Sequence, residues 1–305
     1  MHVMKAHETE GLDNSPHARR IIQVAIDLRR GSLAGARVLD LGSAHGMYTL
    51  ECAKRGAYSL GLEGRRAWID QAVATRDSLG LSSAEFAQAD VRELSEEQFG
   101  RFDVSLCLGL LYHLTAEEAF ALLKKLYEMT DDFLIVDTQF ALAPQEDRTL
   151  NGRIYSGCEF PEHPAGTSPE DIEGNMGAAL DGDHSFWFTL PSLINMLGEV
   201  GFTSVLELKW PADHLYKDGA FRVHEDYVTL VAMRGAPMGE MHGAPVPSGL
   251  QRMPEDASLF FLERPSRVQI GWLNKRPPTP AEPLADPERR SLGARLKAGV
   301  KAFLG

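Results

Sequence analysis

The chain has 305 residues, of which 44% are hydrophobic and 24% charged, so it can bury one substantial core. Its 31 basic and 43 acidic residues give a formal net charge of −12, which disfavours a nucleic acid partner. The sequence contains no long uncharged apolar run that would predict a membrane span. Residues 1–20 lack the apolar core of a secretory signal, so we expect a cytoplasmic protein. Cys52, Cys107 and Cys158 lie far apart in sequence and predict neither a zinc site nor redox chemistry.

Residues 1–35 are predicted to form an N-terminal helical segment, because apolar side chains recur at helical spacing over 15–30. From residue 36, short apolar runs alternate with amphipathic segments, a pattern typical of a parallel sheet with crossover helices. Five strands are predicted in this part, at 37–41, 58–62, 85–89, 102–108 and 133–138. Helices are predicted between them, at 46–55, 66–79 and 115–129.

The alternation stops over residues 139–188 and resumes with a helix predicted to begin at Thr189 and to end before Gly201. Residues 203–209 and 227–233 follow one another without a helical crossover, which predicts an antiparallel pair at the sheet edge. The predicted domain therefore spans residues 36–234, with 139–188 as an insertion.

Residues 235–305 are predicted to be a linker and a C-terminal extension, because they are rich in proline and glycine. The extension ends in a tail, 289–305, with basic residues beside an apolar stripe at helical spacing. Such a tail could lie on an anionic membrane surface. Docking on the acidic protein itself, or disorder, is the favoured alternative, because the tail is short and contains two internal glycines.

The strongest chemical signal is VLDLGSAHG at 38–46, a strand that leads into a glycine-containing turn and then a helix. Such a turn lets the backbone approach a ligand, and the free N–H groups of the helix meet the ligand's polar end. Glu63 ends the second strand, where a carboxylate accepts hydrogen bonds from both ribose hydroxyls of an adenosine ligand. Asp90 and Val91 follow the third strand, where one polar and one apolar contact would hold an adenine ring.

These motifs resemble those of class I S-adenosylmethionine (SAM)-dependent methyltransferases. DLGSAHG is similar to their first motif, Glu63 to the ribose acid, Asp90 to the adenine-edge acid, and FDVSLCLG at 102–109 to the fourth-strand motif. The resemblance covers residues 36–140 and, through the last helix and strand pair, extends to residue 234. Ala44 departs from it, since a glycine usually stands there. The implied fold is α/β and Rossmann-like: a mostly parallel seven-stranded sheet with an antiparallel last strand and helices on both faces.

The resemblance implies SAM as the cofactor and S-adenosylhomocysteine as the product. The residues implied to bind the cofactor follow the carboxyl ends of the first four strands: Asp40, Gly42, Ser43, Gly46, Glu63, Gly64, Arg65, Asp90, Val91, Leu108 and Gly109. An NAD(P)-dependent dehydrogenase is the competing interpretation, because it would use the same turn and acid. The spacing of the glycines does not match the dinucleotide fingerprint G-x-G-x-x-G, so the methyltransferase is favoured.

Two histidines are candidate general bases, since the unperturbed pKa of histidine is close to neutrality. His113 follows the fourth strand and His184 lies in the insertion; for each, a structural role is the alternative. The insertion is predicted to cover the acceptor, because long segments without regular structure in compact domains are often functional. Three aromatic residues are predicted to contact the acceptor: Tyr112, Tyr155 and Trp187. No established metal-ligand spacing occurs, so no metal is predicted.

The favoured function is methyl transfer to a hydroxyl of a small molecule such as a sugar, a polyketide or a phenolic compound. LGLLYHL at 108–114 and the segment 185–202 also resemble the tRNA wobble-uridine carboxymethyltransferases and their bacterial relatives, so a tRNA-modifying (carboxy)methyltransferase is an alternative. The negative net charge disfavours it. A non-catalytic SAM-fold interaction protein is a third hypothesis, suggested by Ala44.

Overall fold

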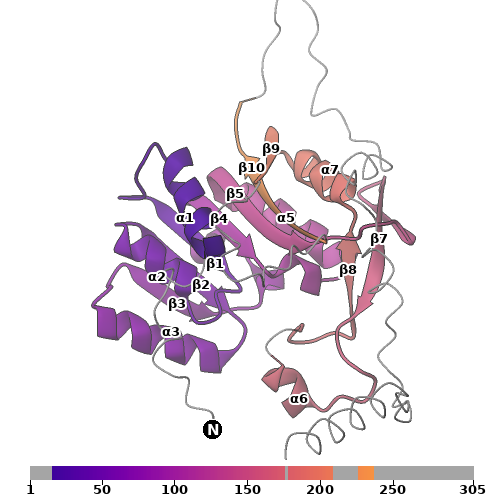
Figure 1. Ribbon diagram of the computed structural model, residues 1–305, viewed down its shortest axis with the longest axis horizontal. Coiled ribbons are helices and arrows are strands. Elements are labelled where there is room, and N and C mark those ends of the chain that lie inside the picture. Colours follow the sequence, from indigo (N-terminus) through magenta and orange to yellow (C-terminus); the bar gives the residue numbers. More distant parts are fainter. Residues whose placement is uncertain (1–15, 176–177, 209–225, 237–305) are drawn as a thin grey trace, which may run out of the picture. The chain divides into compact units, whose positions relative to one another are not determined.

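The computed structural model describes residues 16–175, 178–208 and 226–236 (Figure 1). The first part alternates as predicted: α1 (Pro16–Leu28), β1 (Arg37–Leu41), α2 (Met47–Lys54), β2 (Tyr58–Glu63), α3 (Arg66–Leu79), β3 (Ala84–Gln88), β4 (Phe102–Leu108), α5 (Ala116–Met129) and β5 (Thr130–Gln139). Short helical segments also occur, namely η3 (Val91–Glu93), α4 (Glu96–Phe99) and η4 (Leu111–His113). The predicted tail at 289–305 lies outside the described residues, so its membrane role stays a prediction.

The main sheet has seven strands in the order β3-β2-β1-β4-β5-β10-β9, where β9 is Ser204–Glu207 and β10 is Tyr227–Met233. Strands β1 to β5 are parallel, whereas β10 is antiparallel to both β5 and β9. The predicted seven-stranded sheet with an antiparallel last strand is therefore confirmed. The chain moves outward from β1 to β3 and then returns to β4, so the strand order switches between β1 and β4. Open sheets of this type bind ligands at the carboxyl ends of such neighbouring strands.

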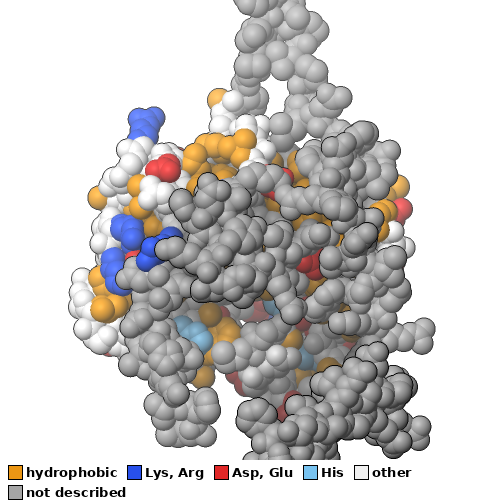
Figure 2. All heavy atoms as spheres, viewed as in Figure 1, with side chains coloured by type: hydrophobic (Ala, Val, Ile, Leu, Met, Phe, Trp, Pro, Cys, Tyr) orange, Lys and Arg blue, Asp and Glu red, His pale blue; other side chains and the backbone are white. Residues whose placement is uncertain are grey.

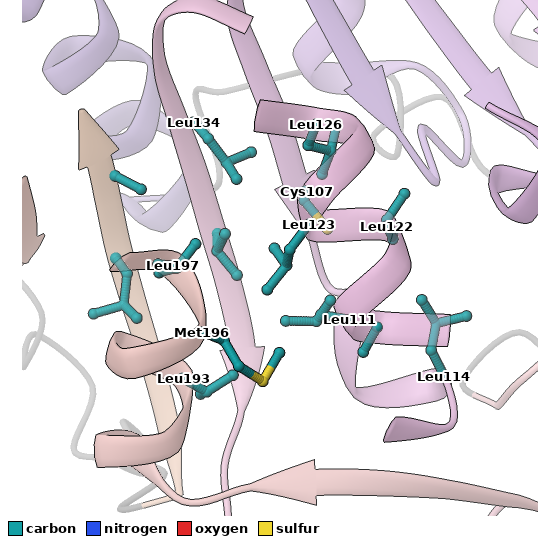
Figure 3. Close-up of a cluster of buried hydrophobic side chains, with 14 of the residues drawn as sticks. Cys107, Leu111, Leu114, Leu122, Leu123, Leu126, Leu134, Leu193, Met196 and Leu197 are labelled. Atoms are coloured by element: carbon teal, nitrogen blue, oxygen red, sulfur yellow. The ribbon is translucent and has the colours of Figure 1, made fainter. Parts of the chain in front are cut away.

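Residues that alternate along the central strands pack into two separate apolar clusters, one on each face of the sheet. Val38 and Ile135 belong to the cluster that includes α1 and α2, whereas Leu39 and Leu134 belong to the cluster that includes α5 and α7 (Leu190–Val200). Figure 3 shows the second cluster, in which leucines of α5 and α7 surround the side chains of the sheet. Helices therefore cover both faces, as predicted, because every central strand has two apolar faces to bury.

Side-chain caps fix the starts of the two helices that bury this second cluster. The Thr115 hydroxyl accepts the Glu118 N–H, and the Glu118 carboxylate accepts the Thr115 N–H, which makes a capping box at the start of α5. The Thr189 hydroxyl caps α7 in the same way by accepting the Ser192 N–H. Among the described residues, no helix is long and apolar enough to cross a membrane.

The insertion at 139–188 is regular, so the prediction of an irregular segment is wrong. It forms a three-stranded antiparallel sheet of β6 (Glu146–Leu150), β7 (Arg153–Pro161) and β8 (His184–Phe188), together with the short helix α6 (Pro169–Gly174). β6 is largely charged, so alternation was not visible, and β7 is far from β8 in sequence. The turn Asn151-Gly152 between β6 and β7, with positive φ at both residues, is a hairpin signal that our prediction missed.

Gly157 provides a test of this insertion sheet. It lies opposite Phe188, and a Cβ added to it would lie 2.3 Å from the Trp187 carbonyl oxygen and 2.4 Å from the Phe186 ring. We expect Gly157→Ala to lower the free energy of unfolding by about 1–3 kcal/mol, the usual cost of overpacking, when measured by denaturant titration. Gly174→Ala in α6 is the matched control, since an added Cβ meets no atom within 4 Å. Equal stabilities of the two variants would contradict the packing of β7 on β8.

Candidate cofactor and acceptor site

A cavity of about 500 Å³ opens at the carboxyl ends of the first four strands. Gly42, Glu63, Asp90 and Gly109, which lie at or just after the ends of β1, β2, β3 and β4, all contribute to its wall. Residues 178–182 of the insertion form another part of the wall. The volume lies within the range of about 300–1,000 Å³ that is usual for small-molecule sites.

Asp40 lies behind the turn that follows β1. Its Oδ2 accepts hydrogen bonds from the Thr49 backbone N–H at 3.1 Å and from the Thr49 hydroxyl at 2.7 Å, which ties β1 to the first turn of α2. Burial raises the pKa of Asp40 to about 7, although the hydrogen bonds from Thr49 oppose this shift. Asp40, which the resemblance implied to be a cofactor ligand, does not line the cavity; it fixes the turn that does.

Three further residues from the predicted cofactor set shape this region without lining the cavity. The Ser43 hydroxyl is directed toward β2, since a Cβ added at Gly61 would lie 2.8 Å from its oxygen. Gly46 starts α2 with a φ of 78°, and a Cβ there would lie 2.5 Å from the Phe86 ring. Leu108 packs against the apolar cluster on the α1 side of the sheet.

Ala44 has a φ of 46°, in the left-handed region that favours glycine. The sequence departs from the family motif at this position, yet the backbone still adopts a conformation that suits a glycine. The Ala44 N–H donates to Glu63 Oε2 at 3.0 Å, and this bond helps to hold the turn. The alanine therefore strains the turn without removing it.

The Glu63 carboxylate is fixed by backbone donors on both of its oxygens. Oε2 accepts the Ala44 N–H, and Oε1 accepts the Arg65 N–H at 2.8 Å. The residue is only 5% exposed, yet it lines the cavity. Because each carboxylate oxygen has a second lone pair, this group can still accept two hydroxyl donors from a ligand. Its position and chemistry fit the ribose of SAM.

Asp90 lines the cavity and is held by Arg92. Its oxygens accept the Arg92 backbone N–H at 2.9 Å and the guanidinium at distances down to 2.6 Å. These hydrogen bonds hold the pKa of Asp90 below its usual value. Arg92 also pairs with Asp181 of the insertion at 2.6 Å. No spacing in the sequence predicts this bridge, because Asp90 and Asp181 lie 91 positions apart.

Arg65 connects the cofactor side of the cavity to the insertion. Its guanidinium donates to the carbonyl oxygens of Asn175 at 3.0 Å and Ala178 at 3.2 Å, and lies 5.1 Å from the centre of the Trp68 ring. Arg65 was in the predicted cofactor set, as were Gly64 and Val91, and all three line the cavity. Trp68, which also lines it, was missed.

His113 lines the cavity and is paired with a buried carboxylate. Its Nδ1 lies 3.1 Å and 3.0 Å from the two oxygens of Glu162, whose side chain is 2% exposed. Burial would raise the pKa of Glu162, but the His113 hydrogen bond and charge, together with the Ala179 N–H at 2.9 Å, hold the pKa below its usual value. His184, the other candidate base, also lines the cavity. Glu162 was not predicted.

The three residues predicted to contact an acceptor lie in different environments, and none lines the cavity. Tyr112 and Trp187 are partly exposed, with ring centres 6.2 Å apart, and Trp187 Nε1 donates to the Tyr112 carbonyl oxygen at 3.1 Å. Burial raises the pKa of Tyr112 to about 12. Tyr155, by contrast, is completely buried against Phe120 and Phe188. The structure therefore places Tyr155 in the core and not in the cavity wall.

Asp137, at the end of β5, is another buried carboxylate that the sequence-based prediction missed, and it lies near Tyr112. Asp137 accepts hydrogen bonds from His17 of α1 at 2.7 Å and from the Thr229 hydroxyl at 2.5 Å. Asp137 thus links α1 and β10 to the end of β5. Within the described ranges, no three His, Cys, Asp or Glu side chains come together as a candidate metal site.

Comparison with known sequences finds relatives for the part of the chain that contains β1 to β4. Residues 38–132 match the family described as "Methyltransferase domain". The ubiquinone biosynthesis O-methyltransferase of Acinetobacter baylyi (strain ATCC 33305 / BD413 / ADP1) is 34% identical over 89 residues, 29% of this chain and 37% of the relative. The enzyme of the same name from Pseudomonas aeruginosa (strain LESB58) is 38% identical over 90 residues, 29% of this chain and 38% of the relative. The chain thus spans less than two fifths of the length of these curated relatives.

Solved structures extend the similarity over most of the chain. The N-terminal domain of EvdMO1 with SAH bound superposes with a TM-score of 0.57 at 25% identity, over 72% of this chain and 82% of that one. The same domain in the presence of SAH and D-fucose gives a TM-score of 0.57 at 26% identity, over 73% and 84%. In that neighbour the shared fold holds SAH.

Ala44→Gly tests the strain in the turn after β1. Glycine adopts a φ of 46° freely, so we expect this change to raise the free energy of unfolding by up to about 1 kcal/mol in denaturant titrations. Ala74→Gly at an exposed position of α3 is the control and should lower it by about 1 kcal/mol. A loss of stability in Ala44→Gly equal to that in Ala74→Gly would show that Ala44 is not left-handed.

Asp40→Asn tests the raised pKa of the buried acid. The folded pKa of about 7 lies above the unfolded value of about 4, so the stability linked to protonated Asp40 is complete below about pH 4 and is lost as the pH rises through 7. Asparagine stays neutral and can accept the same hydrogen bonds. We therefore expect a larger gain in thermal stability for Asp40→Asn at pH 8 than at pH 5. The control Asp70→Asn, at an exposed ion pair, should show no such trend. A gain in Asp40→Asn that does not depend on pH would refute the raised pKa of Asp40.

Proposed function

We propose that this chain, a class I SAM-dependent methyltransferase by its motifs, its fold and its relatives, transfers a methyl group to a hydroxyl of a small molecule. One observation carries the proposal. The Glu63 carboxylate is held by two backbone N–H groups in a cavity at the carboxyl ends of four strands, where it can accept both hydroxyls of a ribose.

The other cavity residues have chemistry that fits the rest of SAM. Asp90 and Val91 offer one polar and one apolar contact for the edge of an adenine ring, and Gly42 and Gly109 allow close approach to the backbone. When bound, SAM would supply a methyl group attached to a positively charged sulfur. The Arg92 bridge to Asp181 and the Arg65 bonds to Asn175 and Ala178 hold the insertion wall over this space, which limits access of water.

We propose that His113 accepts the proton of the acceptor hydroxyl. Its ring lines the cavity, and histidine accepts a proton near neutral pH. His184 lines the same cavity from the start of β8 and is the second candidate. His113 is preferred, because a buried carboxylate partner would stabilise the charge that its ring gains.

The acceptor is proposed to be a hydroxylated ring, phenolic or sugar-like. The named relatives are O-methyltransferases of ubiquinone biosynthesis, and one structural neighbour was crystallised in the presence of D-fucose. Neither Tyr112 nor Trp187 lines the cavity, but the centre of the Tyr112 ring lies 4.2 Å from that of the His113 ring, so an acceptor beside His113 would have these partly exposed rings as an apolar surface close by.

A tRNA substrate is less consistent with the charge of the protein. On the face shown in Figure 2, the basic side chains among the described atoms lie at the left, toward α1 and α2. Lys54 and Arg55 of α2 pair with Glu51, and Arg66 of α3 pairs with Asp70. Pairing with acids of the same helix leaves little charge for phosphates. A non-catalytic role also loses support, since Ala44 keeps the backbone of the cofactor turn.

Glu63→Ala tests the cofactor assignment. Loss of the ribose partner should weaken SAM and S-adenosylhomocysteine binding by about 1–3 kcal/mol, roughly 5- to 150-fold, in calorimetric titrations. Glu85→Ala on the exposed surface of β3 is the matched control and should bind both with the affinity of the parent. Absence of binding by the parent protein would overturn the proposed function, and unchanged affinity in a folded Glu63→Ala would overturn the role of Glu63.

A further inference from the structure

We propose that Glu162 is a positioning residue, which keeps a proton on Nδ1 of His113 and thereby presents Nε2 to the cavity as the proton-accepting atom. This inference rests on the proposed function. It goes beyond it by naming the atom of His113 that acts and the group that selects this atom.

The hydrogen-bond geometry determines the tautomer of His113. Nδ1 lies 3.1 Å and 3.0 Å from the two oxygens of Glu162, so both oxygens share this one ring nitrogen. An ionised carboxylate only accepts hydrogen bonds, and therefore Nδ1 must carry the proton that is donated. A neutral imidazole has a single N–H, so Nε2 is left with a free lone pair.

Burial protects the hydrogen bond between His113 and Glu162 from competition by water. The side chain of Glu162 is 2% exposed and that of His113 is 16% exposed, so water competes weakly for either partner. Glu162 remains ionised, because hydrogen bonds from His113 and from the Ala179 N–H outweigh the effect of its burial on its pKa. A carboxylate in such a place also stabilises the imidazolium that forms when Nε2 takes a proton.

The same carboxylate holds the insertion wall of the cavity. Glu162 and His163 directly follow β7, and together they bracket one residue of the wall. Glu162 accepts the Ala179 N–H at 2.9 Å, while His163 Nε2 lies 2.8 Å from the Ala179 carbonyl oxygen. The Glu162 N–H in turn donates to the Asp183 carbonyl oxygen at 2.9 Å. The orientation of the His113 ring and the position of the cavity wall therefore depend on one side chain.

The proton and charge balance is simple. The acceptor hydroxyl gives its proton to Nε2 of His113 and its oxygen takes up the methyl group, while the electron pair of the broken carbon–sulfur bond stays on sulfur. The positive charge thus passes from the sulfonium to the imidazolium, where Glu162 neutralises it. No oxidant, reductant or metal is needed for this step.

Ring ¹⁵N shifts of His113 in the full chain, recorded with S-adenosylhomocysteine bound, test the tautomer directly. We expect the parent to show a proton on Nδ1. In Glu162→Gln the amide oxygen can still accept the Ala179 N–H, while the amide nitrogen donates to Nδ1 and so moves the ring proton to Nε2. Turnover of an acceptor found by screening hydroxylated rings with labelled SAM should then fall by about 100-fold or more, with S-adenosylhomocysteine affinity nearly unchanged.

Two further variants separate positioning from a purely structural role. Glu159→Gln, at an exposed carboxylate on the same strand β7 that pairs with Arg148, should leave the tautomer and turnover unchanged. Glu162→Asp retains the charge and should keep the proton on Nδ1, with turnover partly restored. A parent ring protonated on Nε2 alone would overturn the proposal. So would a Glu162→Gln protein in which affinity for S-adenosylhomocysteine falls as much as turnover. If the parent binds this ligand but methylates nothing, the proposed function fails, while the ¹⁵N shifts still test Glu162.

Discussion

The hydrogen bonds between Asp40 and Thr49 join the end of β1 to the start of α2, and the geometry of the cavity depends on them. They fix the turn between these elements, in which the Ala44 N–H is directed at Glu63. Glu63 in turn is held where it lines the cavity. The turn keeps this geometry even with a left-handed alanine, because a buried acid and a second carboxylate brace it from both sides.

The insertion depends on this core for its own position. Side chains of the core and the insertion meet at several places: the Arg65 guanidinium at the carbonyls of Asn175 and Ala178, the Arg92 bridge to Asp181, Trp187 Nε1 at the Tyr112 carbonyl oxygen, and the His113 contact with Glu162. The Arg92–Asp181 pair is exposed to solvent and Arg92 also pairs with Asp90, so this bridge adds little stability. The His113–Glu162 contact is buried, so loss of His113 would leave a buried carboxylate without its charged partner.

The central sheet could be predicted because each strand is a run of apolar residues and each helix has a single apolar face. In the structure, successive residues of such a run face opposite sides of the sheet: Val38 packs into one apolar cluster and Leu39 into the other. The sequence also predicted that Glu63 and Asp90 lie at one edge of the parallel sheet, where strand ends meet, and both line the cavity; their contact with a cofactor stays a prediction. It could not show that Asp40 and Ser43 face backward from the turn. Nor could it pair His113 with Glu162, or bury Tyr155, because these depend on contacts between segments far apart in sequence.

Tyr112 and His113 are neighbours in η4, and their ring centres lie 4.2 Å apart. His113 reaches the cavity and Glu162, whereas Tyr112 lies among the rings of Trp187 and Tyr227. In the proposed reaction these two neighbours have separate tasks: His113 takes the proton, and the aromatic group around Tyr112 selects the ring of the acceptor. Because the two rings are in contact, a change at Tyr112 would act both on the acceptor and on the His113 ring on which proton transfer depends.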